Sequence, residues 1–364
     1  MLDKGKISSR QLTLLVFTFI SSTATLFLPA FLADDAKQDA WISLLPAGVV
    51  GVLTALVVTA LARKFPGKTL TEYVTILLGP VLGKCIGILY LWFYLHMTSI
   101  VVREVVFTVI SSLLPRTPLE AVTIIIIIVC AYTVRQGIEV IARTNVLSVT
   151  FSYVSIALIL VLSASNLDIG NVTPVLSRGI GPVLRASVTP SGWFGEVVGV
   201  AFLIPFVNSQ DQARRAALIG VVWSALTLMF LVLVTLMALG PGMAALFLFP
   251  TLRVVRLINV AEFFQRTEAI FLIPWIISNY IKICVFYYII TKITSDLFKP
   301  RDSLSLTLPL GIIVGSMSLY IFRNNVDLVE FLDRVWGIYS LPFELGIPLL
   351  LLIFASLRKT GKRV

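Results

Sequence analysis

Charged residues are scarce in this chain. Asp, Glu, Lys and Arg make up 13% of its 364 residues, whereas 58% are hydrophobic and the mean hydropathy is +0.97. A soluble domain carries about 25% charged residues, so this composition excludes one. Apolar runs of about 20 residues recur, which is the length that a helix needs to cross a bilayer. A β-barrel is excluded because runs such as IIIIIV at 124–129 do not alternate. We therefore predict an all-α polytopic membrane protein.

Residues for metal and covalent chemistry are also few. The one histidine, His96, has no second histidine or cysteine nearby, and Cys85, Cys130 and Cys284 show no C-x-x-C spacing. Packing roles are therefore expected for all four. The stretch FPGKT at 65–69 lacks the first glycine of a phosphate-binding loop. With no nucleophile–base arrangement either, we expect no enzyme, no metal and no cofactor.

The apolar runs predict ten spans in one integral membrane domain, residues 1–364. Their approximate bounds are 10–32, 40–62, 82–112, 118–135, 143–165, 192–210, 214–239, 267–292, 304–323 and 335–357. The first span follows Lys4, Lys6 and Arg10, but it is too long for a signal peptide.

The basic residues predict the orientation of these spans. Eighteen of the 29 Lys and Arg residues fall in segments on the side of the N-terminus and nine on the other side, with Arg103 and Lys282 inside spans. Cytoplasmic segments carry the excess of Lys and Arg, so we expect both termini in the cytoplasm. The net charge of +10 then reflects topology, and we expect no nucleic-acid partner.

Two connecting segments have helical apolar periodicity. Residues 65–79 place Leu70, Val74, Leu77 and Leu78 on one face, which indicates an amphipathic helix at the membrane surface. Residues 241–266 do the same with Leu252, Val255, Ile258 and Val260.

The ten spans divide into two sets of five around the loop 166–190. Two halves with an odd number of spans lie in opposite orientations if they share a structure, which is the inverted-repeat plan of many transporters. We predict repeats at about 8–165 and 190–357. In that plan the first helix of each half breaks near the bilayer centre, and the substrate binds between the breaks.

Both helices that begin a half contain features of such a break. The first has SSTAT at 21–25 followed by Pro29, and the sixth has Gly192, Gly195, Gly199 and Pro205. The sequence FLPAF at 27–31 is echoed by FLIPF at 202–206. Unwound backbone in lipid needs polar partners, which hydroxyl groups or a bound ligand supply.

The hydroxyl residues of the first span are therefore candidate ligand-binding residues: Ser21, Ser22, Thr23 and Thr25. They have donors for a carboxylate, and the positive end of the outer half-helix would add to this. The alternative is that they bond to helix carbonyls and pack against a neighbouring helix.

The chain resembles a known family, the B subunits of spore germinant receptors in the amino acid–polyamine–organocation superfamily. The resemblance is carried by ISSRQL at 7–12, by RKFPGKTLTEYVTILLGPVLGKCIGILYLWFY at 63–94, and by FPTLRVVRLINVAEFFQRTEAIFLIPWIISNYIK at 249–282. It implies a fold like that of the leucine transporter and a role in sensing nutrients in the spore inner membrane. It also implies two partners, a larger A subunit and a lipoprotein C subunit. SSTAT departs from the glycine-containing break usual in the superfamily.

Under that fold, spans 1, 3, 6 and 8 line a central site. The further ligand-binding candidates are Tyr94 and Thr98 in span 3, Gly199 and Phe202 in span 6, and Cys284 and Tyr288 in span 8. Without the fold, an aromatic stripe at helical spacing is more often simple packing.

Charges inside spans are candidates for coupling or for structural ion pairs. Lys282 and Glu344 lie near the middle of spans 8 and 10, and Glu196 lies about one turn inside span 6. Arg103 and Glu104 are adjacent, so their side chains face different directions. No deep anionic partner for the amine of a ligand is evident in the sequence, so backbone carbonyls are the expected acceptors.

Three functions fit these patterns. The first is a receptor subunit that binds a small nutrient, an amino acid before a sugar, nucleoside or inorganic ion. The second is a proton- or sodium-coupled amino acid transporter, although VLSVTFSYVSIAL at 146–158 offers no charged group to replace a coupling ion. The third is a scaffold with a vestigial pocket. The residues alone support a pocket, and only the resemblance favours the receptor.

Overall fold

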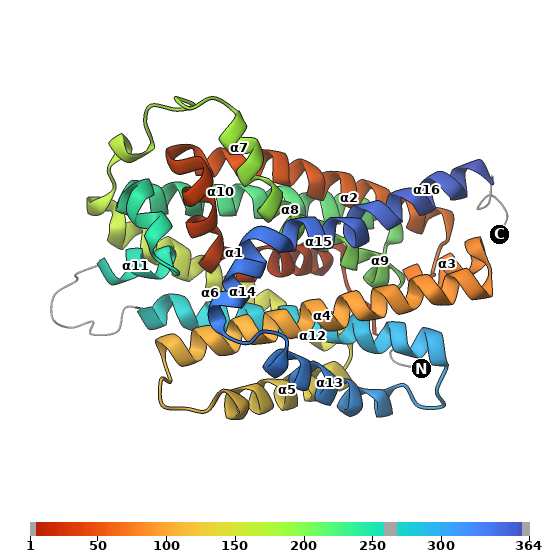
Figure 1. The fold of residues 1–364 in the computed structure, drawn as a ribbon. Coiled ribbons are helices and arrows are strands. Elements are labelled where there is room, and N and C mark those ends of the chain that lie inside the picture. Colours follow the sequence, from red (N-terminus) through yellow and green to blue (C-terminus); the bar gives the residue numbers. More distant parts are fainter. Residues whose placement is uncertain (1–4, 258–267, 359–364) are drawn as a thin grey trace.

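The computed structural model describes residues 5–257 and 268–358. Its long helices run alongside one another (Figure 1). The α-helices are α1 (Ser9–Ala36), α2 (Leu44–Lys64), α3 (Leu70–Leu78), α4 (Pro80–Ser112), α5 (Leu119–Arg135), α6 (Ile138–Ser163), α7 (Gly181–Ala186), α8 (Val188–Gly195), α9 (Val200–Leu203), α10 (Ala213–Leu246), α11 (Pro250–Leu257), α12 (Glu268–Phe298), α13 (Thr307–Tyr320), α14 (Asn325–Glu330), α15 (Trp336–Leu341) and α16 (Ile347–Leu357).

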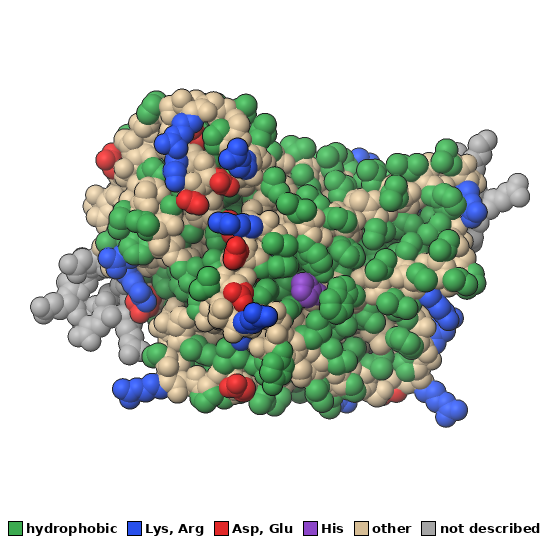
Figure 2. Space-filling view, in the orientation of Figure 1, with side chains coloured by type: hydrophobic (Ala, Val, Ile, Leu, Met, Phe, Trp, Pro, Cys, Tyr) green, Lys and Arg blue, Asp and Glu red, His purple; other side chains and the backbone are tan. Residues whose placement is uncertain are grey.

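Seven segments of the described chain are long and apolar enough to cross a membrane. The first, Ser9–Lys64, contains both α1 and α2, which a 3-10 helix at Lys37–Ser43 separates. Helices α5 and α13 are apolar but shorter. Figure 2 shows a broad band of hydrophobic side chains, with charged side chains concentrated towards the two ends of the bundle. These features identify the chain as a multi-pass membrane protein, while the count of ten spans stays a prediction.

Helix α1 is continuous, contrary to the predicted break at Ser21–Thr25. Pro29 lacks an N–H, so it leaves the carbonyl of Thr25, four residues earlier, without its helical donor. The hydroxyl of Thr251 in α11 donates to that carbonyl at 2.9 Å. The backbone therefore keeps its hydrogen bonds without unwinding.

The sixth predicted span is interrupted, as expected. Helix α8 passes into a 3-10 segment at Glu196–Gly199, and the short α9 is followed by another 3-10 turn at Ile204–Phe206. The glycines have a packing reason. A Cβ at Gly195 would lie 2.0 Å from Oε2 of Glu344, and one at Gly192 would lie 2.7 Å from Nε1 of Trp336.

The tenth predicted span is also irregular. Two π-helical segments, Phe331–Val335 and Pro342–Gly346, flank α15. Glu344 lies in the second of them, opposite α8.

Both segments expected to form surface helices are helical, as α3 and α11, and their position at the membrane surface stays a prediction. Leu70, Val74 and Leu77 of α3 are buried, whereas Ile76 is exposed, and a capping box of Thr69 and Glu72 begins the helix. In α11 Leu252 and Val255 are buried. Ile258 and Val260, the other two residues of the predicted face, lie outside the described residues.

Helices α1 and α12 lie at the centre of the bundle. Helix α1 contacts α6, α10 and α12, and α12 contacts α4, α5 and α6. The segment before α1 is tied to the end of the sixth span, because Ile7 bonds through its N–H to Phe206 and through its carbonyl to Asn208, both at 2.9 Å. Figure 1 shows α3 and the end of α16 at one end of the bundle, here called the terminal end, and α7 and α11 at the other.

Candidate functional site

The hydroxyl groups of SSTAT face two separate places. Ser21, Ser22 and Thr25 line a cavity against α6, α10 and α12, while Thr23 lies on another side of α1 against α8 and α12. Because α1 stays helical, consecutive residues point about 100° apart. The predicted ligand set is therefore split between two sites.

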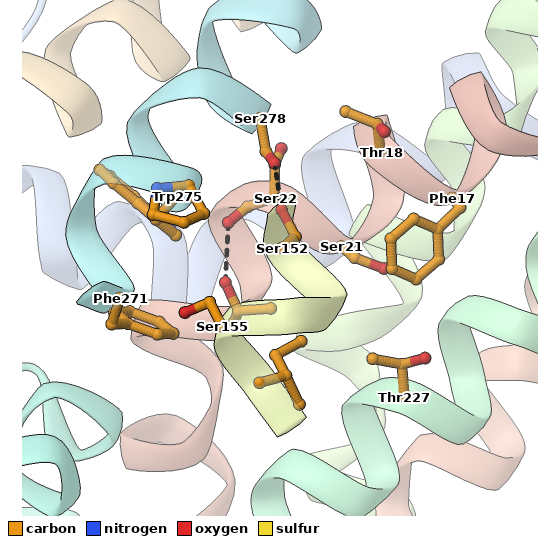
Figure 3. Close-up of a pocket in the computed structure, with 13 residues that line it drawn as sticks. Phe17, Thr18, Ser21, Ser22, Ser152, Ser155, Thr227, Phe271, Trp275 and Ser278 are labelled. Atoms are coloured by element: carbon orange, nitrogen blue, oxygen red, sulfur yellow. Dashed lines mark hydrogen bonds between the residues drawn. The ribbon is translucent and has the colours of Figure 1, made fainter. Parts of the chain in front are cut away.

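The first site, which we call the hydroxyl cavity, is shown in Figure 3. It has a volume of about 40 Å³ and is lined by Phe17, Thr18, Ser21, Ser22, Thr25, Ser152, Ser155, Ile156, Thr227, Phe271, Pro274, Trp275 and Ser278. That volume holds about three or four water molecules, at roughly 10–15 Å³ each. No charged side chain lines it.

Some polar groups of the hydroxyl cavity are satisfied and others are not. Ser152 and Ser278 are hydrogen-bonded at 3.0 Å, and Ser155 donates to the carbonyl of Ile270 at 2.7 Å. The hydroxyls of Ser21 and Ser22 and the indole N–H of Trp275 are buried with no hydrogen-bond partner in the described chain. Buried groups of this kind normally meet water or a ligand.

The second site contains a buried ion pair. Nζ of Lys282 in α12 lies 2.8 Å and 2.9 Å from the two carboxylate oxygens of Glu196, and 3.0 Å from the hydroxyl of Thr23. The same hydroxyl accepts from Nε1 of Trp193 at 2.9 Å. The side chains of Lys282 and Glu196 are 0% and 1% exposed. Their pairing brings together α1, α12 and the interrupted sixth span.

Two more carboxyl groups lie close to this pair. Glu104 of α4 lines the same small cavity as Thr23, Glu196 and Lys282, and Glu344 packs on Gly195 within electrostatic range of both charges. Both oxygens of Glu344 and Oε2 of Glu104 have no hydrogen-bond partner among the described residues. These five residues, Thr23, Glu104, Glu196, Lys282 and Glu344, are called the charge cluster below. Glu104 and Glu344 have no cationic partner here, and a buried carboxyl in that position stays neutral unless a cation is added beside it.

The charge cluster bears on two expectations. Lys282 and Glu196 form a structural ion pair, which is one of the two alternatives given for charges inside spans. The expectation of no deep anionic partner for an amine was wrong, because carboxyl groups from three different elements meet here. Arg103, by contrast, points away and donates to Asn325 at 3.3 Å, as its adjacency to Glu104 predicted.

The remaining candidates lie nearer the terminal end. The rings of Tyr94 and Phe202 meet edge to face at 5.4 Å, and the Tyr94 hydroxyl lies 3.4 Å from where a Cβ at Gly199 would be. Thr98 donates to the carbonyl of Tyr94 at 2.6 Å, so its hydroxyl is already engaged. None of these lines either cavity, and their role in binding stays a prediction.

The two candidates from α12 diverge. Tyr288 packs against Phe206 with ring centroids 5.8 Å apart. Cys284 lies beside Cys130 of α5, on a side of α12 that faces away from both cavities.

Sequence reasoning missed the contribution of α6 to the hydroxyl cavity. Ser148, Ser152 and Ser155 are spaced as one helical face, and their hydroxyls contact Ser278 or the backbone of α12. The i, i+4, i+7 spacing was a usable signal, because polar residues on one face of a membrane helix indicate a helix interface or a cavity.

The architecture is that of helical membrane transporters. The structure of MHP1, a nucleobase-cation-symport-1 family transporter, superposes with a TM-score of 0.73 at 12% identity, over 99% of this chain and 80% of that one. MhsT in complex with L-phenylalanine gives 0.63 at 14% identity, over 97% and 99%. The predicted transporter-like, all-helical fold is confirmed.

The sequence comparisons give the family. The chain belongs to the family described as spore germination protein, whose model matches residues 6–326. It is 29% identical over 363 residues to spore germination protein KB of Bacillus subtilis (strain 168), covering 98% of this chain and 96% of that protein. It is 26% identical to spore germination protein YndE of the same organism, covering 99% of both. The resemblance found in the sequence is confirmed.

Proposed function

We propose that this chain is the nutrient-sensing membrane subunit of a spore germinant receptor and that its ligand is a small zwitterion, an amino acid. The observation that carries the proposal is the buried Lys282–Glu196 pair, surrounded by carboxyl oxygens that lack partners. The family supports the role in germination.

The chemistry of the charge cluster matches a zwitterion. The ammonium of Lys282 would bind the carboxylate of the ligand, and Glu196 with Glu104 would bind its amine. The exchange replaces one buried ion pair by two, so no charge is left unpaired. Thr23 would remain a neutral hydrogen-bond partner.

Binding of such a ligand requires movement. The cavity at the cluster measures only about 10 Å³, room for a single water molecule. An amino acid enters only if Lys282 and Glu196 separate, which moves α12 relative to the sixth span. Binding would thus shift the protein between two states, as a sensor requires.

The expected setting follows from the resemblance. We infer a location in the spore inner membrane with both termini cytoplasmic, and partnership with an A subunit and a lipoprotein C subunit. Relatives named as germination proteins A2 and B2 of Bacillus subtilis (strain 168) support a receptor of several subunits.

The test uses a double variant, because Lys282→Met alone leaves a buried carboxylate unpaired. Lys282→Met/Glu196→Gln removes both charges. The purified protein is screened by thermal shift against amino acids, since a ligand of the folded state raises the melting temperature. We expect one amino acid to raise it, its amide analogue to fail, and the double variant to lose the response.

Ser224→Ala serves as a matched control, because that hydroxyl is buried in α10 and bonds only within its own helix. Retained binding in the double variant would overturn the proposed site. A coupled transporter is the second candidate, because the solved structures of the same fold are transporters. Uptake of the identified amino acid into liposomes by this chain alone would favour that alternative.

A further inference from the structure

A large groove opens at the terminal end of the bundle, far from both cavities. It has a volume of about 790 Å³ and lies between α3, the start of α4 and the end of α12. Its basic lining residues are Lys68, Lys84 and Lys299. We call it the terminal groove.

The two acidic residues of the terminal groove, Glu72 and Asp296, already have partners. Lys292 pairs with Glu72 at 3.7 Å and more closely with Asp296, and both Thr69 and Thr71 donate to Asp296, at 2.8 and 2.6 Å. These contacts fix α3 to α12.

The three lysines of the groove remain available. Lys68, Lys84 and Lys299 are exposed, and none has an ion-pair partner in the residues that the structure describes. With Lys292 shared between Glu72 and Asp296, the groove keeps a net positive charge, and its three lysines face an anion without a direct ion-pair partner.

Apolar side chains surround these charges. Ile76 and Phe298 line the groove with exposed fractions of 56% and 68%, and Val81 and Leu82 at the start of α4 are 73% and 58% exposed. Lysines beside exposed apolar side chains, next to a short amphipathic helix such as α3, are typical of the boundary between headgroups and acyl chains. A water-soluble anion would gain nothing from contact with these apolar side chains, which we call the apolar rim.

We propose that the terminal groove binds the headgroup of an anionic phospholipid, with its phosphate on the three lysines and its acyl chains along the apolar rim. The charge distribution predicts that this end is cytoplasmic, the side on which basic pockets between helices meet anionic lipid headgroups. The proposal is independent of the nutrient site.

The test compares Lys68→Gln/Lys84→Gln/Lys299→Gln with the control Lys64→Gln/Arg135→Gln/Arg215→Gln. The control removes the same charge from the same end, but its residues line none of the cavities described above. Binding of phosphatidylglycerol to the full chain in detergent is measured by native mass spectrometry. Since each lysine near an anionic lipid surface contributes about a fivefold factor, the groove variant should bind on the order of 100-fold more weakly, and the control should match the parent protein.

Three outcomes would overturn the proposal. One is an equal loss of lipid binding in the groove variant and in the control, which would indicate a diffuse attraction between the lipid and all basic residues at this end. The second is equal binding of phosphatidylcholine, which carries no net charge. The third is competition by glycerol 3-phosphate at the concentration at which the lipid binds, which would identify a free phosphate site. Unchanged melting temperatures without lipid verify that both variants fold.

Discussion

At the scale of single residues, the site depends on close packing between polar groups and glycine. The carboxyl group of Glu344 occupies the space that a side chain at Gly195 would need. This contact positions an unpaired carboxyl next to the Lys282–Glu196 pair without bonding it to either.

Gly195→Ala is therefore expected to destabilise the protein. Its Cβ would lie 2.0 Å from the carboxyl of Glu344, and overpacking of a buried site costs about 1–3 kcal/mol. The melting temperature in detergent should fall. Gly195→Ala/Glu344→Ala should recover part of the loss, because the carboxyl is gone.

Gly242→Ala is the matched control for that change, since a Cβ there meets nothing within 4 Å. An equal fall in both alanine variants would refute the contact with Glu344 as the cause.

At the scale of elements, a proline and a threonine act together. Pro29 removes a hydrogen bond from α1, and the hydroxyl of Thr251 replaces it from α11. Helix α1 therefore stays continuous while it is fixed to a helix on the opposite end from the termini. Of the two predicted breaks, only the one in the sixth span is present.

Thr251→Val should destabilise the protein, because it leaves the buried carbonyl of Thr25 unsatisfied, at about 1–3 kcal/mol. In Pro29→Ala/Thr251→Val the new N–H at position 29 can bond that carbonyl, so the loss should be smaller than in the single variant. Melting temperatures of the four proteins in this cycle measure the coupling.

Thr235→Val is the matched control for Thr251→Val, because the hydroxyl of Thr235 bonds only to Leu231 in its own helix. If the effects of Pro29→Ala and Thr251→Val on the melting temperature are additive, the hydroxyl of Thr251 does not replace the hydrogen bond that Pro29 removes from α1.

At the scale of the whole molecule, charge and hydropathy predict one orientation. The charged ends flank an apolar band (Figure 2), and the excess of basic residues predicts that the terminal end is cytoplasmic. Both the nutrient proposal and the lipid proposal use this orientation.

A cysteine-labelling experiment checks it. In a Cys85→Ser background, Ser177→Cys places a thiol in the loop at the end opposite the termini, and Lys64→Cys places one at the terminal end. A membrane-impermeant thiol reagent added to intact cells should label the first variant and label the second only after lysis. The reverse pattern would place the termini outside.

The sequence by itself determined the all-helical membrane class, the surface helices α3 and α11, the irregular sixth span and the family. These features are encoded locally, in apolar periodicity, in proline and glycine, and in motifs within one segment. It also marked Lys282, Glu196 and Glu344, because a charge in an apolar run stands out in any arrangement.

Only the tertiary structure decided which of these residues meet. Lys282 lies 86 residues from Glu196 and 259 from Thr23 along the chain, and the rotation of each helix about its axis settles their contact. The rotation of α1 about its axis also places Thr23 in the charge cluster and Ser21 and Ser22 in the hydroxyl cavity. The continuity of α1 depended on a hydroxyl from α11, a partner that no pattern within α1 contains.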